Sequence, residues 1–513
     1  MKILLTTLNS QYVHSNPALK YLYTVTADSP VDVSLREFTI NNEPAYVYGE
    51  ILRAECDLVC FSCYIWNIEQ IKALAADLKK AAPTLKIALG GPEVSFAAHV
   101  LAAQNSWIDY IFCGEGEYSF YRFCQLAAEA ESKAGGQMPV LIEGLNTVPG
   151  LVYRQEGRIY VNPQIEPMDL ALIPFPYSVL ECEPDKVIYY ESSRGCPFRC
   201  SYCLSAAEKS VRALPLERVR SELGYFLYKK VRQVKFIDRT FNYDEERAYE
   251  IFRYLIDNDN GVSNFHFEIC ADLLTPRLLA LLATARKGLF QLEIGIQSAN
   301  PRTLAAVGRR ENIYPILYNV EKLLAAGNIH IHVDLIAGLP YESYELFARS
   351  FDKVYALGAD MLQLGFLKLL GGSPLYEQAR EFKIKAQERA PYEVISTAWL
   401  SARELVRLKE IEKMLSIYYN RGGFARTLGF LLAGPGASPF KLYEKLADFY
   451  YGHGFQHRER KKEDQYRILR AFCAETLPEA EREKAFAALA ADLEETFAAE
   501  EVRRFLKRGW EIA

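Results

Sequence analysis

Three cysteines near the middle of the chain are the residues best suited to metal chemistry. Cys196, Cys200 and Cys203 lie in the segment SRGCPFRCSYC with the spacing C-x3-C-x2-C. The segment CDLVCFSC, at residues 56–63, contains three cysteines with the same spacing. In a reducing compartment, clustered cysteines indicate metal or redox chemistry before they indicate disulfides. The spacing alone does not decide which of the two triplets is the metal site.

The local sequence around each triplet separates them. The later triplet follows a predicted strand and includes Gly195 and Pro197, so its loop can curl and point three thiolates at one centre. The earlier triplet lies along a predicted buried strand, where Cys60 and Cys63 would point to opposite faces. In an extended strand at ~3.3 Å per residue, Cys56 would lie over ~20 Å from Cys63. We therefore predict an iron–sulfur cluster at the later triplet and small hydrophobic core residues at the earlier one.

The number of ligands in the later loop also matters. A 4Fe–4S cluster that is held by three thiolates leaves one iron open to a substrate. A closed zinc site would need a fourth cysteine or histidine, and this loop contains neither. With Tyr202 directly before the third cysteine, the motif resembles that of the radical S-adenosylmethionine (radical SAM) superfamily. The resemblance implies that Cys196, Cys200 and Cys203 hold a 4Fe–4S cluster, whose electron splits S-adenosylmethionine and yields a 5′-deoxyadenosyl radical.

Four later segments resemble further motifs of that superfamily. VKFIDRTF (residues 234–241) resembles the second-strand motif, and LEIGIQSANP (residues 292–301) resembles the fourth-strand motif. DLIAGLPYE (residues 334–342) resembles the fifth-strand glycine motif, although Tyr341 stands where glycine is more usual, and LLGGSPL (residues 369–375) resembles the last-strand segment. For each polar residue alone, a hydrogen-bonded group inside a barrel is the alternative role. The resemblance implies S-adenosylmethionine contacts from Tyr202, Asp238, Arg239, Glu293, Gln297, Ser298 and Gly338.

A pair of histidines lies in one of the predicted strands. His330 and His332 are two residues apart, so they share a face with Asp334. Such a group suits either a metal site or a hydrogen-bonded polar layer inside the barrel. We favour the polar layer.

The front of the chain carries three segments with glycine or polar residues at predicted strand ends. They are SCYIWN (residues 62–67), LGGPEVS (residues 89–95) and CGEGE (residues 113–117). Glycine-rich strand ends allow a backbone to approach a flat macrocycle or its nucleotide tail. In this order, ahead of the radical SAM motifs, they resemble the cobalamin-binding domain of a radical SAM subgroup. The resemblance implies cobalamin contacts from Ser62, Gly90, Gly91, Gly114, Glu115 and Gly116.

The D-x-H-x-x-G signature, which supplies an axial histidine to cobalt in some cobalamin enzymes, is missing. His14 lies in the loop after the first predicted strand, where that histidine would fall. Asn16 and Pro17 in the same loop already predict the start of a helix. His14 as a cobalt ligand is a hypothesis that electron paramagnetic resonance (EPR) of the cob(II)alamin form would test.

Residues 1–130 must position the front motifs. Short apolar strands alternate there with helical patterns, which predicts a doubly wound parallel sheet of the flavodoxin or Rossmann type. Clear helices are predicted over residues 68–82 and 117–130. The predicted strands are residues 2–8, 31–38, 57–64, 86–91 and 110–117.

A connector and a second alternating region follow. Residues 131–185 form the connector, with a predicted loop at 135–139 and a hairpin at 150–163. Residues 186–380 predict a partial TIM barrel of the (β/α)6 type, which places its chemistry at the carboxyl ends of the strands. Its predicted strands are residues 187–192, 234–238, 265–270, 290–298, 329–340 and 360–370.

Residues 381–513 change to helical patterns, with Phe486, Leu489, Leu493 and Phe497 at helical spacing. The region resembles the C-terminal domain of one bacterial branch of these proteins. We expect it to cover the barrel mouth and to shape the substrate site.

Composition and charge limit the partners. Lys and Arg number 60 and Asp and Glu number 65, which gives a net charge of −5 and no basic stripe for nucleic acid. No apolar run reaches the ~20 residues of a membrane span, and the chain opens on a strand pattern rather than a signal peptide. We expect a cytoplasmic protein with no nucleic-acid or membrane partner. The resemblance implies a flavodoxin- or ferredoxin-type electron donor and an unidentified small-molecule or peptide substrate.

The leading interpretation is a cobalamin-dependent radical SAM methyltransferase that acts at an unactivated carbon or phosphorus centre. In this scheme one S-adenosylmethionine methylates cobalamin, a second one is cleaved at the cluster, and the substrate radical takes the methyl group. One alternative is a related enzyme with another radical outcome, such as ring contraction, cyclisation or cleavage. The others are a methylthiotransferase, which needs a second cluster in the front domain, and a non-catalytic cobalamin or redox sensor.

Overall fold

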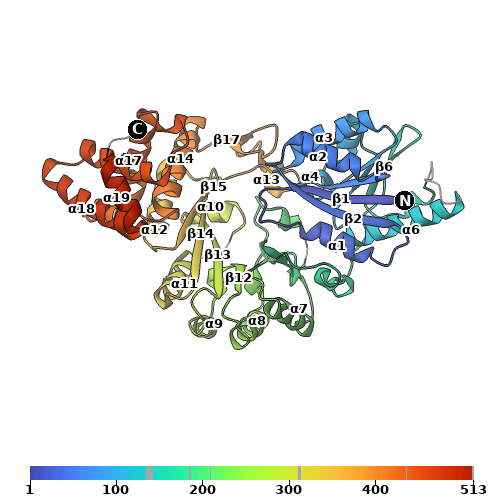
Figure 1. Cartoon of the computed structure of the whole chain (residues 1–513), viewed down its shortest axis with the longest axis horizontal. Helices are drawn as coiled ribbons and strands as arrows, with labels where there is room; N and C mark the ends of the chain where they lie inside the picture. The colour runs from blue at the N-terminus through green and yellow to red at the C-terminus, as the bar shows by residue number, and fades with distance from the viewer. Residues whose placement is uncertain (135–141, 184–185, 208–209, 310–312, 435, 511–513) are drawn as a thin grey trace.

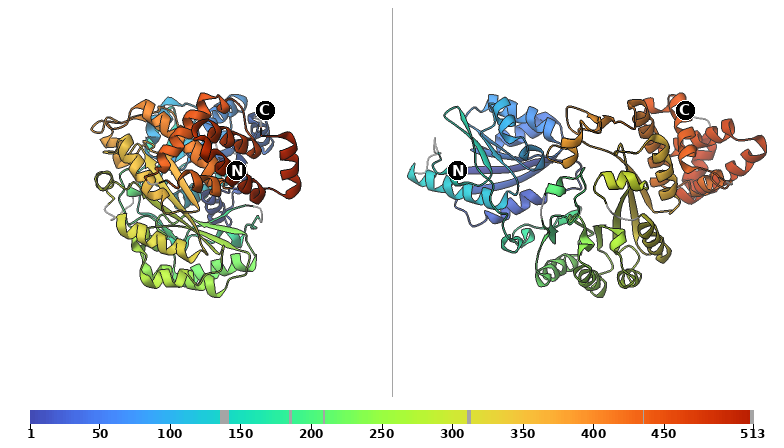
Figure 2. Two further views of the ribbon diagram at one scale, coloured as in Figure 1. Left: turned by 90° about the vertical axis from the view of Figure 1, so that its left-hand side faces the viewer. Right: turned by 180° about the vertical axis from the view of Figure 1, so that it is seen from behind.

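The protein has a sheet domain at its N-terminus, a second sheet domain in the middle and a helical domain at its C-terminus (Figure 1). The computed structural model describes residues 1–134, 142–183, 186–207, 210–309, 313–434 and 436–510, so the predicted loop at 135–139 lies outside it. The first and last domains lie on either side of the middle one, as opposite views show (Figures 1 and 2). The predicted α/β architecture with a helical C-terminal region is confirmed.

In the described residues, the first sheet has strand order β2-β1-β3-β4-β5-β6-β7. The first five strands pair in parallel, in the 2-1-3-4-5 order of a doubly wound sheet. The fifth strand ends well before residue 117, because Gly114 turns the chain at φ +74° and a helix begins at Glu117. The strands are β1 (Lys2–Asn9), β2 (Asp32–Thr39), β3 (Leu58–Ser62), β4 (Lys86–Gly90), β5 (Tyr110–Phe112), β6 (Leu151–Gln155) and β7 (Arg158–Val161).

Helices cover both faces of this sheet because its central strands are apolar on both sides. Every residue of β3 is buried. One face packs against α2, α3 and α5, and the opposite face packs against α1 and α6 (Figure 1). The helices are α1 (Pro17–Val25), α2 (Pro44–Arg53), α3 (Ile68–Ala81), α4 (Pro92–Ser95), α5 (Ala98–Gln104) and α6 (Glu117–Lys133).

The predicted hairpin is present, but it does not stand apart from the first domain. β6 and β7 pair in an antiparallel ladder and turn at Glu156 and Gly157, both at positive φ. β6 also pairs with β5, so the hairpin extends the first sheet beyond residue 130. The two strands are far apart in the chain, and local sequence patterns do not reveal such a pairing. Single 3-10 turns lie on either side of the hairpin, at η1 (Leu145–Thr147), η2 (Leu170–Leu172) and η3 (Pro176–Ser178).

The middle domain is built on a parallel sheet. Its order, for the residues that are described, is β15-β14-β13-β12-β11-β8, so all six predicted strands are confirmed. They are β8 (Ile188–Tyr190), β11 (Gln233–Phe236), β12 (Asn264–Ile269), β13 (Phe290–Gln297), β14 (His330–Ala337) and β15 (Met361–Phe366). The short strands β9 (Ser193–Arg194) and β10 (Arg212–Ala213) form a separate antiparallel pair. The helices are α7 (Leu216–Tyr228), α8 (Glu245–Asp257), α9 (Pro276–Leu282), α10 (Pro301–Ala306), α11 (Ile313–Ala326), α12 (Tyr344–Tyr355) and α13 (Pro374–Gln378).

Alternation along these strands separates a core face from a polar face. β13 alternates buried and half-buried residues along its whole length. Leu292 and Ile294 belong to the core cluster under the helices, whereas Glu293 and Gln297 lie on the other face. The polar motif residues therefore line the side of the sheet that faces away from the helices.

The C-terminal domain is helical, as predicted, and its core is continuous with that of the middle domain. Leu408 and Tyr443 belong to the same buried cluster as the strands of the second sheet. Leu489 and Leu493 are buried on α18, Phe486 is partly buried, and Phe497 caps that helix. The elements are β16 (Lys385–Ala386), β17 (Val394–Ser396), α14 (Ala402–Leu415), the π-helix η7 (Ser416–Asn420), α15 (Ala425–Leu431), α16 (Pro439–Gly452), η8 (Phe455–His457), α17 (Lys462–Thr476), α18 (Glu479–Thr496) and α19 (Ala499–Arg508).

The C-terminal domain also covers the open edge of the second sheet. The side chain of Asn420 accepts a hydrogen bond from Leu362 N–H (3.0 Å) and donates one to Leu362 C=O (2.9 Å). This amide replaces a neighbouring strand along β15, which is the last strand of the sheet. Tyr419 from the same π-helix hydrogen-bonds the carbonyl of Ala359.

Among the described residues, no helix combines the length and the apolar character needed to cross a lipid bilayer.

Candidate functional site

The three predicted cluster cysteines lie in one curled loop at the carboxyl end of β8. The loop leaves β9 at Gly195, where φ is +102°, and ends at the 3-10 turn η4 (Leu204–Ala207). A hydrogen bond from Cys203 N–H to Cys200 C=O (3.0 Å) closes a turn between the second and third cysteines. Cys200 is buried, and Cys196 and Cys203 are half-buried. The loop has the curled form that the sequence predicts.

Packing against the ends of other strands fixes this loop. Ser201 N–H donates to Val307 C=O, and Leu375 N–H donates to Ser201 C=O, both at 2.8 Å. Gly308, at φ +74°, lies so close that a Cβ would be 2.9 Å from Arg199 O. The loop is therefore held between the end of α10 and the start of α13.

The three sulfurs are not gathered as closely as the ligands of one metal ion would be. Thiolates that bind one zinc ion at ~2.3 Å lie roughly 3.8 Å apart in a tetrahedron. In the described part of the chain, the three cysteine sulfurs do not all lie within 4.8 Å of one another. Three separated thiolates suit a cluster with one iron for each sulfur. The residues present therefore fit a 4Fe–4S cluster.

Asp238, predicted as a cofactor contact, is fully buried and organises the segment before the cysteines. Its carboxylate accepts hydrogen bonds from Ser192 N–H (2.8 Å), Ser192 Oγ (2.6 Å) and Ser193 Oγ (2.7 Å). Burial raises the pKa of Asp238 to about 6, although the serine donors oppose this. The neighbouring Arg239 is exposed, and Thr240 Oγ1 lies 3.5 Å from Cys196 Sγ.

The end of β13 presents an unpaired polar atom beside the cysteine loop. Gln297 has φ +67° next to a bulge, and its buried Oε1 has no hydrogen-bond partner. A Cβ at Gly295 would lie 2.1 Å from Gln297 Nε2, so only glycine lets this side chain fold back over the strand. Arg309 donates to Gly295 C=O (2.8 Å) and to the hydroxyl of Tyr202 (3.3 Å), which joins the strand to the loop.

Ser298 and Gly338 lie in packed surroundings. Ser298 is fully buried and donates to Glu342 Oε1 (2.6 Å), which also accepts from Ser350 Oγ (2.8 Å). Gly338 has φ +98°, and a Cβ there would be 3.4 Å from Leu367 Cβ. A role in cofactor binding for these two residues remains a prediction.

Tyr341, at the position where the resembling motif has glycine, adopts the left-handed backbone conformation that glycine would allow. Its φ is +62°. Its ring lies 4.4 Å from Trp399 and 6.0 Å from Phe382 between centroids, and the guanidinium of Arg302 lies 4.2 Å above it. These contacts with the C-terminal segment offset the backbone strain.

A polar layer crosses the inner face of the second sheet. His332 Nε2 lies 3.0 Å from Asp334 Oδ1, and Glu293 lies 3.1 Å from both His266 Nε2 and Lys235 Nζ. Burial alone would raise the pKa of Glu293, but His266 and Lys235 outweigh it and lower the pKa to about 2.

The layer contains the only described group of three residues whose ligand atoms lie within 4.8 Å of one another, namely Glu293, His332 and Asp334. Lys235 contacts Glu293 and His332 contacts Asp334, which is compatible with the favoured polar layer. His330 is largely exposed at the start of β14 and is not part of the layer. Several buried atoms of the layer, among them His332 Nε2 and Asp334 Oδ1, have no well-aligned hydrogen-bond partner. They are suited to accept a polar ligand.

The predicted glycines of the first domain shape the carboxyl edge of its sheet. Gly91 has φ +103° and ψ 174°, and a Cβ would lie 2.6 Å from Cys63 O, so the loops after β3 and β4 touch. A Cβ at Gly90 would meet only Phe112, at 3.7 Å, and Ser62 Oγ accepts a long hydrogen bond from Asn16.

Exposed aromatic side chains lie on the loops at this edge. Tyr12 after β1 is 72% exposed, Trp66 after β3 is 45% exposed, and Phe96 after β4 is 50% exposed. Trp66 stacks on Tyr64, with ring centroids 4.4 Å apart. Such exposed apolar surface at the edge of a doubly wound sheet suits a large flat ligand, so the residues present fit a macrocycle.

His14, the hypothetical cobalt ligand, contacts the second domain. Its Nδ1 lies 2.7 Å from the hydroxyl of Tyr189 on β8. Burial, assisted by Lys235, lowers the pKa of His14. Asn16 accepts a hydrogen bond from Leu19 N–H at the start of α1, with Pro17 as the first helical residue, as predicted.

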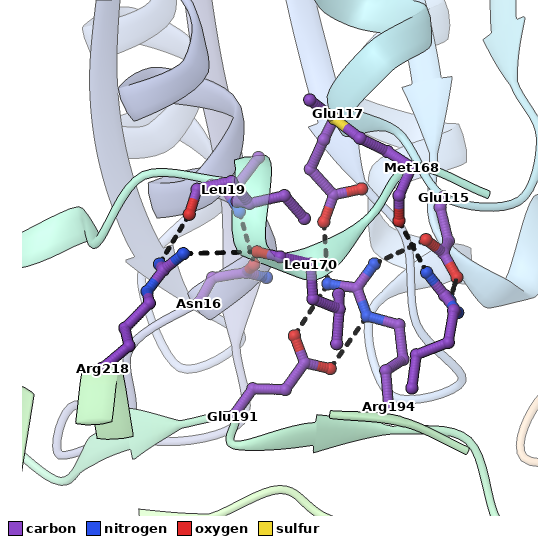
Figure 3. A network of polar contacts seen from close by, with 11 residues as sticks. Asn16, Leu19, Glu115, Glu117, Met168, Leu170, Glu191, Arg194 and Arg218 are labelled. Atoms are coloured by element: carbon purple, nitrogen blue, oxygen red, sulfur yellow. Dashed lines mark hydrogen bonds and ion pairs between the residues drawn. The ribbon is translucent and has the colours of Figure 1, made fainter. Parts of the chain in front are cut away.

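The segment Gly114–Glu117 contacts the second domain through its acidic residues (Figure 3). The sequence predicts Glu115 as a cobalamin contact, but its carboxylate forms ion pairs with Arg194 (2.9 Å) and Arg212. Glu117 pairs with Arg194 at 2.8 Å. Gly114 and Gly116 pack against Gln164 and Leu22 within the first domain.

The earlier cysteine triplet is placed as predicted. Cys60 lies in the core on one face of the first sheet and Cys63 lies in the core on the other face. Burial raises the pKa of both thiols. Neither is suited to hold a metal jointly with the other.

Sequence reasoning missed three residues that the fold brings to the site. Arg309 and Gly308 contact the cysteine loop, and Glu268 lies in the polar layer, where burial raises its pKa to about 7. The dipeptide Gly308-Arg309 directly follows α10. A turn glycine followed by a positive charge, close to the fourth-strand motif, was the sequence signal that could have identified these two residues.

Comparison with protein families agrees with the order of the three domains. A B12 binding domain matches residues 3–123, and the Radical SAM superfamily matches residues 190–354. Residues 380–508 match a protein family of unknown function, DUF4080. The chain thus contains a radical SAM domain behind a B12 binding domain.

Curated relatives include cobalamin-dependent methyltransferases. The chain is 22% identical over 451 residues to "Cobalamin-dependent radical SAM methyltransferase TokK" of Streptomyces tokunonensis, covering 78% of this chain and 62% of TokK. It is 26% identical over 302 residues to "2-(S-pantetheinyl)-carbapenam-3-carboxylate methyltransferase" of Streptantibioticus cattleyicolor, covering 57% and 44%. The chain therefore spans less than two thirds of the length of these relatives.

Solved structures share the fold at low sequence identity. The cobalamin-dependent S-adenosylmethionine radical enzyme OxsB, with aqua-cobalamin and S-adenosylmethionine bound, aligns with a TM-score of 0.64 at 14% identity, covering 100% of this chain and 84% of OxsB. The radical S-adenosylmethionine methyltransferase TsrM of Kitasatospora setae, with cobalamin and a [4Fe-4S] cluster bound, aligns with a TM-score of 0.61 at 17% identity, covering 78% and 82%.

Proposed function

We propose that this chain, whose radical SAM domain follows a B12 binding domain, is a cobalamin-dependent radical SAM methyltransferase that acts at an unactivated carbon or phosphorus centre. One observation carries the proposal. A curled loop presents Cys196, Cys200 and Cys203 at the carboxyl edge of a parallel sheet, next to buried polar atoms without partners.

The three cysteine thiolates would hold the cluster. When bound there, a 4Fe–4S cluster supplies one electron that splits S-adenosylmethionine into methionine and a 5′-deoxyadenosyl radical. Asp238 orients the start of the loop through Ser192 and Ser193, and Arg309 joins Tyr202 to β13. Gln297 Oε1 has no partner and is available to accept a hydrogen bond from S-adenosylmethionine.

The carboxyl edge of the first sheet would hold the second cofactor. When bound there, cobalamin carries the methyl group that is transferred to the substrate. Gly91 allows the loops after β3 and β4 to approach each other, and Trp66 and Phe96 offer apolar surface. The loops after β1 and β5 bond to the second domain, and Phe96 after β4 lies against Gly372 of that domain, so both cofactor edges face the same interface.

The second domain would act as a partial barrel of the (β/α)6 type, with the substrate at the interface between the two sheets. The substrate is a small molecule or a peptide, and a flavodoxin- or ferredoxin-type protein would supply electrons. The front domain offers no site for a second cluster at residues 56–63, because Cys60 and Cys63 lie in different cores. This argues against a methylthiotransferase.

Iron analysis tests the cluster. After anaerobic reconstitution, unmodified protein is expected to hold about four irons per chain, and Cys196→Ala, Cys200→Ala or Cys203→Ala is expected to lose most of them. Cys60→Ala is the matched control, because it removes a buried thiol with no metal role, and it should keep the iron of the unmodified protein. An iron content that is indifferent to the three substitutions would contradict the proposal.

Product analysis tests the reaction. With cluster, cobalamin and a strong reductant, unmodified protein should convert S-adenosylmethionine to 5′-deoxyadenosine. Transfer of label from methyl-labelled S-adenosylmethionine to a substrate would support methylation, and a modified product without label would favour ring contraction, cyclisation or cleavage. Absence of 5′-deoxyadenosine with both cofactors loaded would favour a non-catalytic sensor.

A further inference from the structure

The residue directly before the cysteine loop is bound by the first domain. Arg194 lies on β9 and is followed by Gly195 and Cys196. Its guanidinium contacts Glu115 (2.9 Å) and Glu117 (2.8 Å), which lie at the carboxyl end of β5 and the start of α6 (Figure 3). One side chain therefore connects the loop after β5 to the start of the cysteine loop.

Two further charged residues take part in this contact. Glu191 accepts two hydrogen bonds from Arg194, from Nε at 2.9 Å and from Nη2 at 2.7 Å. Arg212 lies opposite Arg194 in the β9–β10 ladder and pairs with Glu115 as well. We call these five residues the Arg194 network. It contains three carboxylates and two guanidinium groups, so the carboxylates outnumber the cations by one.

Burial gives the network its strength. The side chain of Arg194 is 15% exposed, that of Glu117 is 8% exposed and that of Glu191 is 11% exposed. Ion pairs in such surroundings are screened little by salt, and removing one partner leaves an uncompensated buried charge. The planar guanidinium can contact three carboxylates at once, which an ammonium group cannot do with the same geometry.

The opposite side of the same segment is held by the second domain. Ser192 and Ser193 donate hydrogen bonds to Asp238 at the end of β11. Residues 191–194 are therefore fixed between Asp238 of the second sheet and the two glutamates of the first domain. The position from which the cysteine loop starts depends on both domains.

We propose that Arg194 is a positioning residue that sets the cysteine loop relative to the loop after β5. The proposal rests on the proposed function only in that these two loops would lie beside the cluster and the cobalamin. Arg194 is not itself among the predicted cofactor contacts. It acts through Glu115 and Glu117.

Hydrogen exchange of the chain without cofactors tests the connection. Arg194→Lys keeps the charge but loses the fork, and we expect roughly tenfold faster amide exchange in both residues 113–118 and residues 195–203. Glu191→Gln weakens only the ion pair within the second domain, so residues 113–118 should keep their protection. Arg220→Lys is the control, because Arg220 pairs with Glu217 and Glu250 within the second domain, and it should change neither segment.

Unchanged amide exchange in either segment of Arg194→Lys overturns the proposal. If Arg194→Lys loosens the whole chain, Glu117→Gln decides, since it keeps the arginine and removes the negative charge of one ion pair between the domains. Faster exchange at residues 195–203 in that variant supports the proposal, and unchanged exchange there overturns it.

A spectroscopic readout separates positioning from simple stabilisation. In reconstituted protein, pulsed dipolar EPR between the reduced cluster and cob(II)alamin reports the distance between the two cofactors. We expect a broader distance distribution in Arg194→Lys at equal spin content, and an unchanged distribution would overturn the proposal. Failure of unmodified protein to form 5′-deoxyadenosine would overturn the proposed function and leave the exchange result standing.

Discussion

Asp238 illustrates how one buried carboxylate can organise the segment beside a site. The sequence predicts a cofactor contact there, and the structure gives the carboxylate three donors from Ser192 and Ser193. Its burial raises its pKa to about 6. The residue is therefore suited to hold the segment before Cys196 in place, and its neighbour Thr240 reaches the thiol itself.

Glu342 is a residue at which pH should act directly on stability. The carboxyl group is fully buried, Oε1 accepts from Ser298 and Ser350, and Oε2 has no partner. Burial raises its pKa from 4.5 to about 7, and the two serines only partly oppose the rise. Folding thus favours the protonated form, so its contribution to stability is complete below pH 4.5 and is lost as pH rises through about 7.

We predict that Glu342→Gln removes this pH dependence. The amide of the variant stays neutral at every pH. Between pH 4.5 and 8, the unmodified protein should therefore lose up to ~3 kcal/mol of unfolding free energy relative to the variant. Denaturant titrations at several pH values measure it. Glu495→Gln, at a side chain that is 68% exposed, is the control, and a constant difference across the range would refute the assignment.

At the scale of elements, the loops after the strands carry the constraints. Gly91 combines φ +103° with ψ 174°, a region that is essentially restricted to glycine, and its Cα faces Cys63 O. Gly157 in the hairpin turn has φ +76°, and a Cβ there would meet nothing within 4 Å. A side chain at Gly157 would cause backbone strain alone, whereas a side chain at Gly91 would cause both backbone strain and a steric clash.

We predict that Gly91→Ala destabilises the protein more than Gly157→Ala. Both changes add backbone strain of about 1 kcal/mol or more, and only Gly91→Ala also forces two loops apart, for a total of about 3 kcal/mol. Thermal or denaturant unfolding gives both values. Equal losses would mean that the contact between the loops after β3 and β4 relaxes at no cost.

The edge of the second sheet offers another prediction. Asn420→Ala should destabilise the protein by about 1–3 kcal/mol, because it leaves the buried N–H and C=O of Leu362 without partners. Asn258→Ala removes an exposed local hydrogen bond on α8 and is the matched control. The difference in unfolding free energy between the two variants is the measurement, and a difference near zero would show that water replaces Asn420.

At the scale of the whole molecule, one edge of the first sheet contacts both of the other domains. His14 contacts Tyr189 and Glu115 forms ion pairs with Arg194 in the second domain, and Glu93 hydrogen-bonds Tyr392 of the C-terminal domain. Phe96 also lies against Gly372, where a Cβ would come within 2.2 Å of the ring. The loops that would bind cobalamin are thus the loops that contact the second domain.

The C-terminal domain is expected to be required for folding of the second sheet. A fragment of residues 1–380 would expose the edge of β15 and part of a core that includes Leu408 and Tyr443. We predict that this fragment aggregates or binds hydrophobic dyes, as size-exclusion chromatography and dye fluorescence would reveal. A monomeric fragment with cooperative unfolding would show that the second sheet is stable without these helices.

Local patterns were enough to locate most elements and the cluster loop. Short apolar runs marked the strands of both sheets, and alternation placed Cys60 and Cys63 on opposite faces. Gly195 and Pro197 marked the later triplet as a loop. These properties depend on residues that are neighbours in the chain, so the amino-acid sequence contains them directly.

Only the tertiary structure showed which residues the charged and polar side chains contact. Glu115 meets Arg194 and Arg212 about eighty to a hundred residues away, which no spacing rule indicates. The pairing of β6 with β5, and of Asn420 with β15, has the same origin. Packing of distant segments decides these contacts, because each of them exists only after loops far apart in the sequence have been brought to one edge.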